Sequence, residues 1–178
     1  MTLNFYFARA KQIFPWTTKI QMYEALVGAI LNYNTIPLSG AMKSDLSKVF
    51  ITQKKIIRNI CNADSKAHTA PLFENCDILP LNEHIKYNLI LTSFKILYNK
   101  CPQSINSIVR PKRNNKHLRS SNENLAHIPT TKSNKGDNLA PMVLPKIWNE
   151  MPYFIKEELS LKALKPTLKA FLQLKSNP

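Results

Sequence analysis

The acidic residues are the first candidates for catalysis, because a site that works with two metal ions needs clustered carboxylates that hold the ions about 4 Å apart. The only acids adjacent in the chain, Glu157 and Glu158, suit the approach to a helix or its first turn. The aspartates are isolated from one another: Asp45, Asp64, Asp77 and Asp137. We therefore expect no catalytic residue and no cofactor in this chain.

The histidines and cysteines also lack the spacing of a metal site or a nucleophile. Zinc sites show paired C-x2-C or H-x3-H spacing, and His68 with Cys76 is the nearest candidate here. A nucleophilic pair of Cys61 with His68 has no evident third group to orient the histidine. No GxxxxGK[ST] or GxGxxG loop is present to cradle a phosphate. The sequence predicts no metal site.

The basic residues are the remaining candidates for a functional site. Lysine and arginine number 25 against 11 acids, which gives a net charge of +14, and 44% of the residues are hydrophobic. A surplus of that size favours nucleic acid or another polyanion as partner, although membrane-surface proteins share it. The predicted nucleic-acid-binding residues lie in two stretches: Lys48, Lys54, Lys55 and Arg58, then Arg110, Lys112, Arg113, Lys116, Arg119, Lys132 and Lys135.

The first basic stretch lies on a predicted amphipathic helix. At 100° per residue its apolar residues share one arc of about 120°, with the four cations on the opposite arc, interrupted mainly by Ile51. The alternative for the cations is a solvated face. The apolar arc is Met42, Leu46, Val49, Phe50, Ile56, Ile57 and Ile60, with the polar Gln53 among them.

The second basic stretch, residues 110–138, is rich in Arg, Lys, Asn, Ser and Thr, with Glu123 as its only acid before Asp137. By itself it cannot bury enough apolar surface to offset the entropy of ordering. It is predicted to be either a flexible basic loop or an irregular segment ordered against the helices or a ligand.

The remaining pattern predicts a mainly α fold, a bundle of about five to six helices with a basic, partly irregular segment before the C-terminal helix. Helices are expected over about 3–14, from a cap at Thr17 or Thr18 to Tyr33, and over 81–99, with residues 34–40 as a loop. Shorter helices are expected after Thr69 and near residue 104, and a last one after Ser160. Trp16, Tyr23 and Trp148 are interpreted as core. The predicted domains are a helical core at 1–109, the basic segment 110–138, and 139–178, a Trp-containing turn and a C-terminal helix that pack back on the core.

The odd number of cysteines, three, argues against a disulfide framework and fits a reducing compartment. No apolar run approaches the roughly 18 residues of a membrane span, and no signal peptide is evident. We expect an intracellular protein without a membrane partner. The first helix lacks an evident cap, which predicts that another segment precedes it.

Several stretches, in order, resemble the region after the catalytic palm of non-LTR (LINE-type, jockey-like) retrotransposon reverse transcriptases. They are the runs at Gln53–Ile60, Ala67–Phe73, Ile78–Leu81, Lys95–Pro102 and Trp148–Pro152, with Tyr23–Tyr33 similar to the thumb helix of the family and 164–169 to its closing helix. Three features depart from the family pattern. The Trp-Gly usual after the thumb helix is Ser39-Gly40, the Arg-Thr-x-x-Gly near the end is faint in 130–136, and the Phe before the closing Lys is Leu164.

This resemblance implies an RNA-directed DNA polymerase whose thumb holds the primer–template duplex. It implies Mg²⁺ only for a palm that this chain lacks, an RNA or RNA–DNA hybrid backbone and the polymerase palm as partners, and a ribonucleoprotein of the nucleus or cytoplasm. With no aspartate pair, the chain is expected to be inactive alone, as a truncated or decaying copy or the end of a longer product. The competing interpretations are a helical protein-interaction module and a translated remnant without function.

Overall fold

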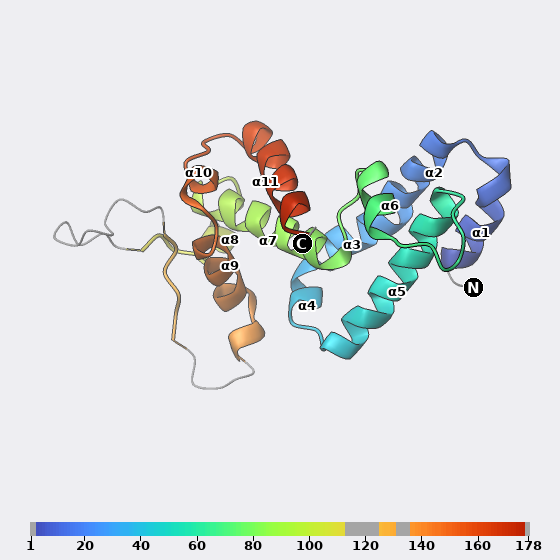
Figure 1. The fold of residues 1–178 in the computed structure, drawn as a ribbon. Helices are drawn as coiled ribbons and strands as arrows, with labels where there is room; N and C mark the ends of the chain where they lie inside the picture. The colour runs from blue at the N-terminus through green and yellow to red at the C-terminus, as the bar shows by residue number, and fades with distance from the viewer. Residues whose placement is uncertain (1–2, 113–124, 131–135, 177–178) are drawn as a thin grey trace. The chain divides into compact units, whose positions relative to one another are not determined.

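The computed structural model describes residues 3–112, 125–130 and 136–176 (Figure 1). These residues are helical or irregular apart from one isolated antiparallel bridge between Pro111 and Ala126, which confirms the predicted mainly α fold. Within the described residues, six helical stretches have ten or more residues: α1 (Leu3–Ile13), the continuous run 16–33, α5 (Lys43–Ile60), α7 (Leu81–Leu97), α9 (Ala140–Asn149) and α11 (Leu161–Ser176). The predicted Trp-containing turn is wrong, because Trp148 lies in α9, which has a proline in its first turn. No helix among the described residues is long and apolar enough to cross a membrane.

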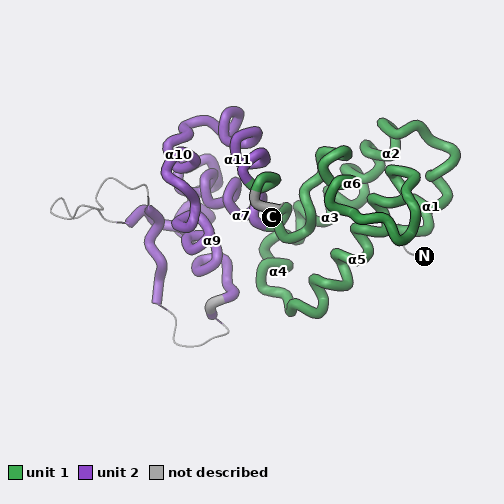
Figure 2. The backbone as a smooth tube through the Cα atoms, in the orientation of Figure 1, with its two compact units in different colours: residues 1–85, 172–178 green, residues 86–171 purple. Residues whose placement is uncertain are grey.

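The chain divides into two compact units, which are described separately (Figure 2). Unit 1 consists of residues 1–85 and 172–178, and unit 2 of residues 86–171. The division falls inside α7 and inside α11. The predicted domain boundaries after residues 109 and 138 stay predictions.

The second helical run of unit 1 begins two or three residues earlier than a cap at Thr17 or Thr18 would place it. Pro15 occupies the N-cap position in an extended conformation (φ −64°, ψ 158°), and the run begins at Trp16. A fixed proline φ suits a helix start, so neither Thr17 nor Thr18 acts as the cap. The run comprises α2 (Trp16–Tyr23), a π-helical turn at Glu24–Gly28 and α3 (Ala29–Tyr33). The residue pattern did not predict the π turn.

The predicted loop 34–40 contains a short helix, α4 (Thr35–Ser39). Its start is stabilised by the buried hydroxyl of Thr35, which donates to the carbonyl of Leu31 at 2.8 Å. Because this bond satisfies a carbonyl at the end of α3, the chain turns with little break in its hydrogen bonding. The loop prediction is wrong at this point.

The buried face of α5 is shorter than the apolar arc that predicted it. Ile56, Ile57 and Ile60 are at most 1% exposed, whereas Met42 is 75% exposed. The intervening apolar residues Leu46, Val49 and Phe50 are half-buried. Only the C-terminal half of the helix is therefore fully packed, where α1 lies beside it (Figure 1).

The side-chain amide of Gln53 joins three segments of unit 1. Its Nε2 group donates to the hydroxyl of Tyr23 at 2.8 Å and to the carbonyl of Leu79 at 3.1 Å. Gln53 is 2% exposed and Tyr23 is 1% exposed, and burial raises the pKa of Tyr23 to about 12. A buried polar group without partners is costly, so these two bonds fix the position of α5 against the second helical run and the segment before α7.

Three helices end on a residue with left-handed backbone, although none of the three glycines has a positive φ. Asn62, Asp77 and Asn99 follow α5, α6 (Ala70–Asn75) and α7 with φ of 53–54°. At each end the next amide donates to the carbonyl five residues earlier, as in the 2.7 Å bond from Lys100 to Lys95. This is the Schellman arrangement, in which asparagine is the usual substitute for glycine.

The core of unit 2 forms around α7, as its apolar sequence predicted. Ile90, Phe94 and Ile96 are at most 2% exposed, and the fully buried Trp148 of α9 lies 6.3 Å from Phe94 between ring centroids. The buried hydroxyl of Ser93 donates to the carbonyl of Leu144 at 3.0 Å, which ties α7 to α9. The predicted core role of Trp148 is confirmed.

Two short helices of unit 2, α8 (Gln103–Asn106) and α10 (Tyr153–Lys156), each start directly after a proline, at Pro102 and Pro152. The sequence predicted a helical turn near residue 104, whereas α10 was not predicted. The hydroxyl of Ser160 accepts a bond from the Lys162 amide at 3.2 Å, which confirms the predicted cap of α11.

Substitution of Asn99 tests the left-handed helix ends. Asn99→Gly is expected to raise the free energy of unfolding by about 0.5 kcal/mol, and Asn99→Ala to lower it by about 1 kcal/mol, because only glycine adopts this backbone without strain. Asn62→Gly should bring no gain, since the Asn62 side chain accepts a bond from the buried Lys19 ammonium at 3.1 Å. Urea unfolding of the three variants measures these changes in the free energy of unfolding. Equal changes in Asn99→Gly and Asn62→Gly would contradict the prediction.

Candidate nucleic-acid interface

Three of the four cations predicted on α5 are occupied by contacts within unit 1. Lys48 pairs with Asp45 at 3.0 Å, and the two side chains are well exposed. The ammonium of Lys54 lies 4.3 Å from the centre of the Phe50 ring. Because an exposed ion pair or cation–π contact contributes little, both lysines can exchange these contacts for a phosphate.

Arg58 has a structural role that its position on the basic arc did not reveal. Its Nε–H donates to the carbonyl of Ala67 at 3.0 Å, and this bond holds the connector between α5 and α6 against the end of α5. Arg58 is half-buried, so its guanidinium is only partly available to a ligand. Of the four predicted cations, Lys55 alone is exposed without an ion pair to any described residue.

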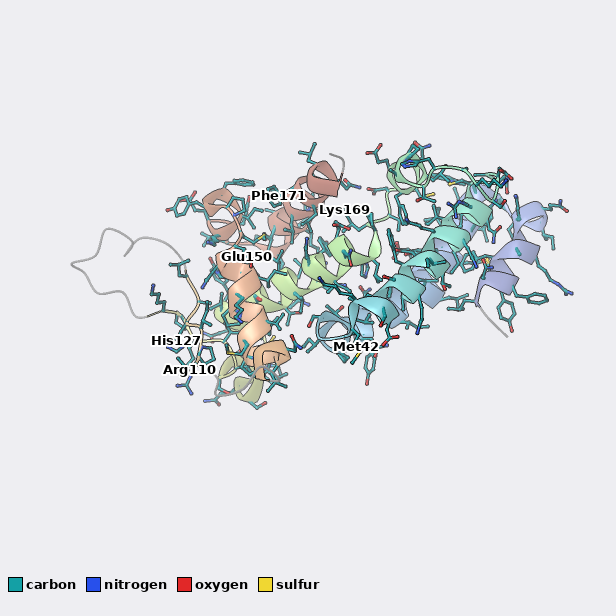
Figure 3. All side chains as sticks on the ribbon, turned by 60° about the horizontal axis from the view of Figure 1, so that its bottom comes forward. Met42, Arg110, His127, Glu150, Lys169 and Phe171 are labelled. Carbon is teal, nitrogen blue, oxygen red and sulfur yellow. The ribbon has the colours of Figure 1, made fainter. Side chains whose placement is uncertain are left out.

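The described ends of the predicted basic segment pair with each other in unit 2. The amide of Lys112 donates to the carbonyl of Leu125 at 2.9 Å, and that of His127 to the carbonyl of Arg110 at 2.8 Å. Figure 3 shows Arg110 and His127 next to each other. The two described ends of segment 110–138 are therefore ordered against each other at residues 110–112 and 125–127. The choice between a flexible loop and an irregular segment ordered against the helices or a ligand stays a prediction.

The cations of this segment are only partly covered by the structure. Arg110 and Lys112 are exposed and make no ion pair with a described residue. The other predicted members lie outside the described residues: Arg113, Lys116, Arg119, Lys132 and Lys135.

Asn149, the residue after Trp148, holds this pairing in place. The Ala126 amide donates to its Oδ1 at 2.8 Å, and its Nδ2 donates to the Ala126 carbonyl at 2.9 Å. The side chain thus acts as a peptide group would in a neighbouring strand. Ala126 is 1% exposed, so both backbone groups would lack partners without it. Asn149 belongs to the Trp148–Pro152 run, but this role of its side chain was not predicted. The only indication in the sequence was an asparagine next to a tryptophan expected in the core.

One aromatic interpretation is wrong. Trp16, expected in the core, is 47% exposed. It is the first residue of its helical run, directly after the N-cap Pro15. Tyr23 is buried as predicted.

Unit 1 also carries an apolar groove. A cavity of about 170 Å³ is lined by residues of α1, the second helical run and α5, among them Leu3, Val27, Ile30 and Ile56. Gln53 lies at its wall, and its Oε1 is buried without a hydrogen-bond partner. Ile30 is 51% exposed. The groove is accessible from solvent at its apolar lining.

The acidic and histidine side chains that sequence reasoning considered for chemistry have local partners. Asp45 pairs with Lys48, and Asp77 accepts a bond from Gln173 at 3.0 Å. His84 donates from Nε2 to Asn32 at 2.9 Å, and burial lowers the pKa of its imidazole. Across residues 3–112, 125–130 and 136–176, no three histidine, cysteine or acidic side chains gather in a way that could hold a metal ion.

Comparisons with protein-family models, with curated proteins and with solved structures found no match to this chain. The resemblance to retrotransposon reverse transcriptases therefore stays a prediction from the motifs.

Removal of the Asn149 side chain tests how the basic segment is held. Asn149→Ala is expected to lower the free energy of unfolding by about 2 kcal/mol, because two buried backbone groups lose their partners. Hydrogen exchange at the Ala126 amide should accelerate. Asn149→Asp keeps the acceptor and loses the donor, so its free energy of unfolding should lie between those of the unmodified protein and Asn149→Ala.

The control for this substitution is Asn75→Ala in unit 1, where the asparagine is exposed. It should leave the exchange of Ala126 unchanged. Unaltered protection of the Ala126 amide in Asn149→Ala would contradict the assigned role.

Proposed function

We propose that this chain is the thumb and post-palm region of a non-LTR retrotransposon reverse transcriptase, which binds the phosphate backbone of RNA or an RNA–DNA hybrid without reading its sequence. The chain is intracellular and has no polymerase activity by itself. The observation that carries the binding is the net charge of +14 together with exposed cations, Lys55, Arg110 and Lys112, that no described acid neutralises. Such cations release counterions from a phosphate backbone, which is the main source of affinity in binding of this kind.

Several of the motif residues on which the proposed origin rests have structural roles in the fold. Ile78 and Leu79 are buried, Trp148 is fully buried, and Arg58 and Asn149 each hold a loop by hydrogen bonds to its backbone. These residues account for the folding of the two units. The binding role rests on the exposed lysines and arginines.

Fluorescence anisotropy with a short RNA–DNA hybrid across a salt titration tests the binding. The affinity should fall steeply with salt, with a log–log slope that reports the number of neutralised phosphates. In the triple variant with Lys55, Arg110 and Lys112 changed to Gln, the slope should decrease by up to about 3, since each lost phosphate contact removes about one.

The matched control changes Lys66, Lys86 and Lys95 to Gln. All three are exposed lysines outside the two predicted basic stretches. The slope of the salt titration should stay closer to that of the unmodified protein in the control than in the triple variant. The proposed function fails if the folded chain does not bind the hybrid at low salt. It also fails if the two variants lose the same amount of affinity for the hybrid.

A protein-interaction module is the second candidate, and the apolar groove of unit 1 favours it. Exposed apolar side chains are frequent in this unit, including Phe5, Ile30 and Met42. An exposed apolar surface of this kind is typical of an interface. In this case the partner is the polymerase palm or another protein, and binding would weaken little with salt. A remnant without function would lack cooperative unfolding.

A further inference from the structure

Two of the three free cysteines meet inside unit 1. The sulfurs of Cys61 and Cys76 are 3.2 Å apart, although the residues are separated by fourteen others in the chain. Each cysteine is the C-cap of its helix, Cys61 of α5 and Cys76 of α6. The left-handed residues Asn62 and Asp77 follow them, so the same kind of helix end turns the chain away at both positions.

We propose that Cys61 and Cys76 form a site of reversible oxidation, at which a low-molecular-weight disulfide such as glutathione disulfide converts the two thiols into one intramolecular disulfide. A disulfide has a sulfur–sulfur bond of about 2.05 Å, so the sulfurs need to approach by about 1 Å. Rotation of the two cysteine side chains is the movement that the proposal requires. The proposal is independent of the proposed binding to nucleic acid.

The exposures of the two cysteines set the order of the steps. Cys61 is half-buried, and Cys76 is 4% exposed. The thiolate of Cys61 attacks one sulfur of the small disulfide, and the first small thiolate leaves. The thiolate of Cys76 then attacks the sulfur of Cys61 and displaces the second small thiolate. The two cysteines lose two electrons and two protons, and the small disulfide becomes two thiols.

The surroundings of Cys76 favour this order. Burial raises the pKa of the Cys76 thiol to about 12, and the thiol of Cys61 adds to the effect, whereas the Trp16 indole and the Lys19 ammonium act in the opposite direction. Cys76 is therefore a poor first nucleophile. Lys19 is 2% exposed and bonded to Asn62 and the Lys11 carbonyl, which keeps its charge near Cys76 for the second step.

Oxidation of the full chain in a glutathione redox buffer tests the proposal. The number of reactive thiols per chain should fall from three to one, and the remaining thiol should be that of Cys101. Trypsin cuts after Arg58, Lys66, Lys86 and Lys100, so each cysteine lies on its own peptide and the linked pair is identified by mass. The closed loop of 16 residues should raise the melting temperature by at least about 5 °C, and a reductant should reverse the rise.

The controls use the third cysteine and the unfolded chain. Cys101→Ser should form the same disulfide, whereas Cys61→Ser and Cys76→Ser should form no intramolecular bond. In guanidinium chloride all three pairings should appear. If three thiols persist in the folded chain, or if Cys101 enters the bond there, the proposal is overturned.

Discussion

The amide of Gln53 is the interaction on which unit 1 depends most. It reaches the hydroxyl of Tyr23 and the carbonyl of Leu79 from the middle of α5, so one buried side chain fixes three segments that are far apart in sequence. Hydrogen bonds inside a protein are highly directional and expensive to leave unmade. The two bonds from Gln53 therefore hold this face of α5 against its neighbours. The lysines lie on the opposite face.

This constraint also explains why the groove and the basic face lie on one helix. Gln53 uses its two N–H groups for the fold, and its carbonyl oxygen remains unpartnered at the groove. Lys55, two residues further, lies outside the buried arc and is exposed. A single helix thus presents an apolar surface and a cationic surface, and the two candidate functions differ in which surface a partner uses.

The helical pattern was predictable because apolar spacing and prolines determine most helix positions. The spacing of Ile56, Ile57 and Ile60 indicated the buried half of α5, and the apolar sequence of α7 indicated a core helix. Met42 follows the same spacing yet is exposed, since periodicity says which face a residue is on and not whether a neighbour covers it.

The candidate site was less predictable, because its contacts join residues distant in the chain. Lys55 could be identified as an exposed cation from its place on the arc. The bond from Arg58 to Ala67 could not, since the connector must first fold back on α5. The same holds for Asn149 with Ala126 and for the meeting of Cys61 with Cys76, where no spacing rule relates the partners.

Lysine footprinting of the chain bound to an RNA–DNA hybrid is the most direct test of the central claim. The rate of acetylation is measured at each lysine, with and without the hybrid, at low salt. The account predicts strong protection of Lys55 and Lys112, and unchanged rates at Lys66 and Lys95. Protection spread evenly over all exposed lysines, or none at Lys55 and Lys112, would contradict a defined phosphate-binding surface.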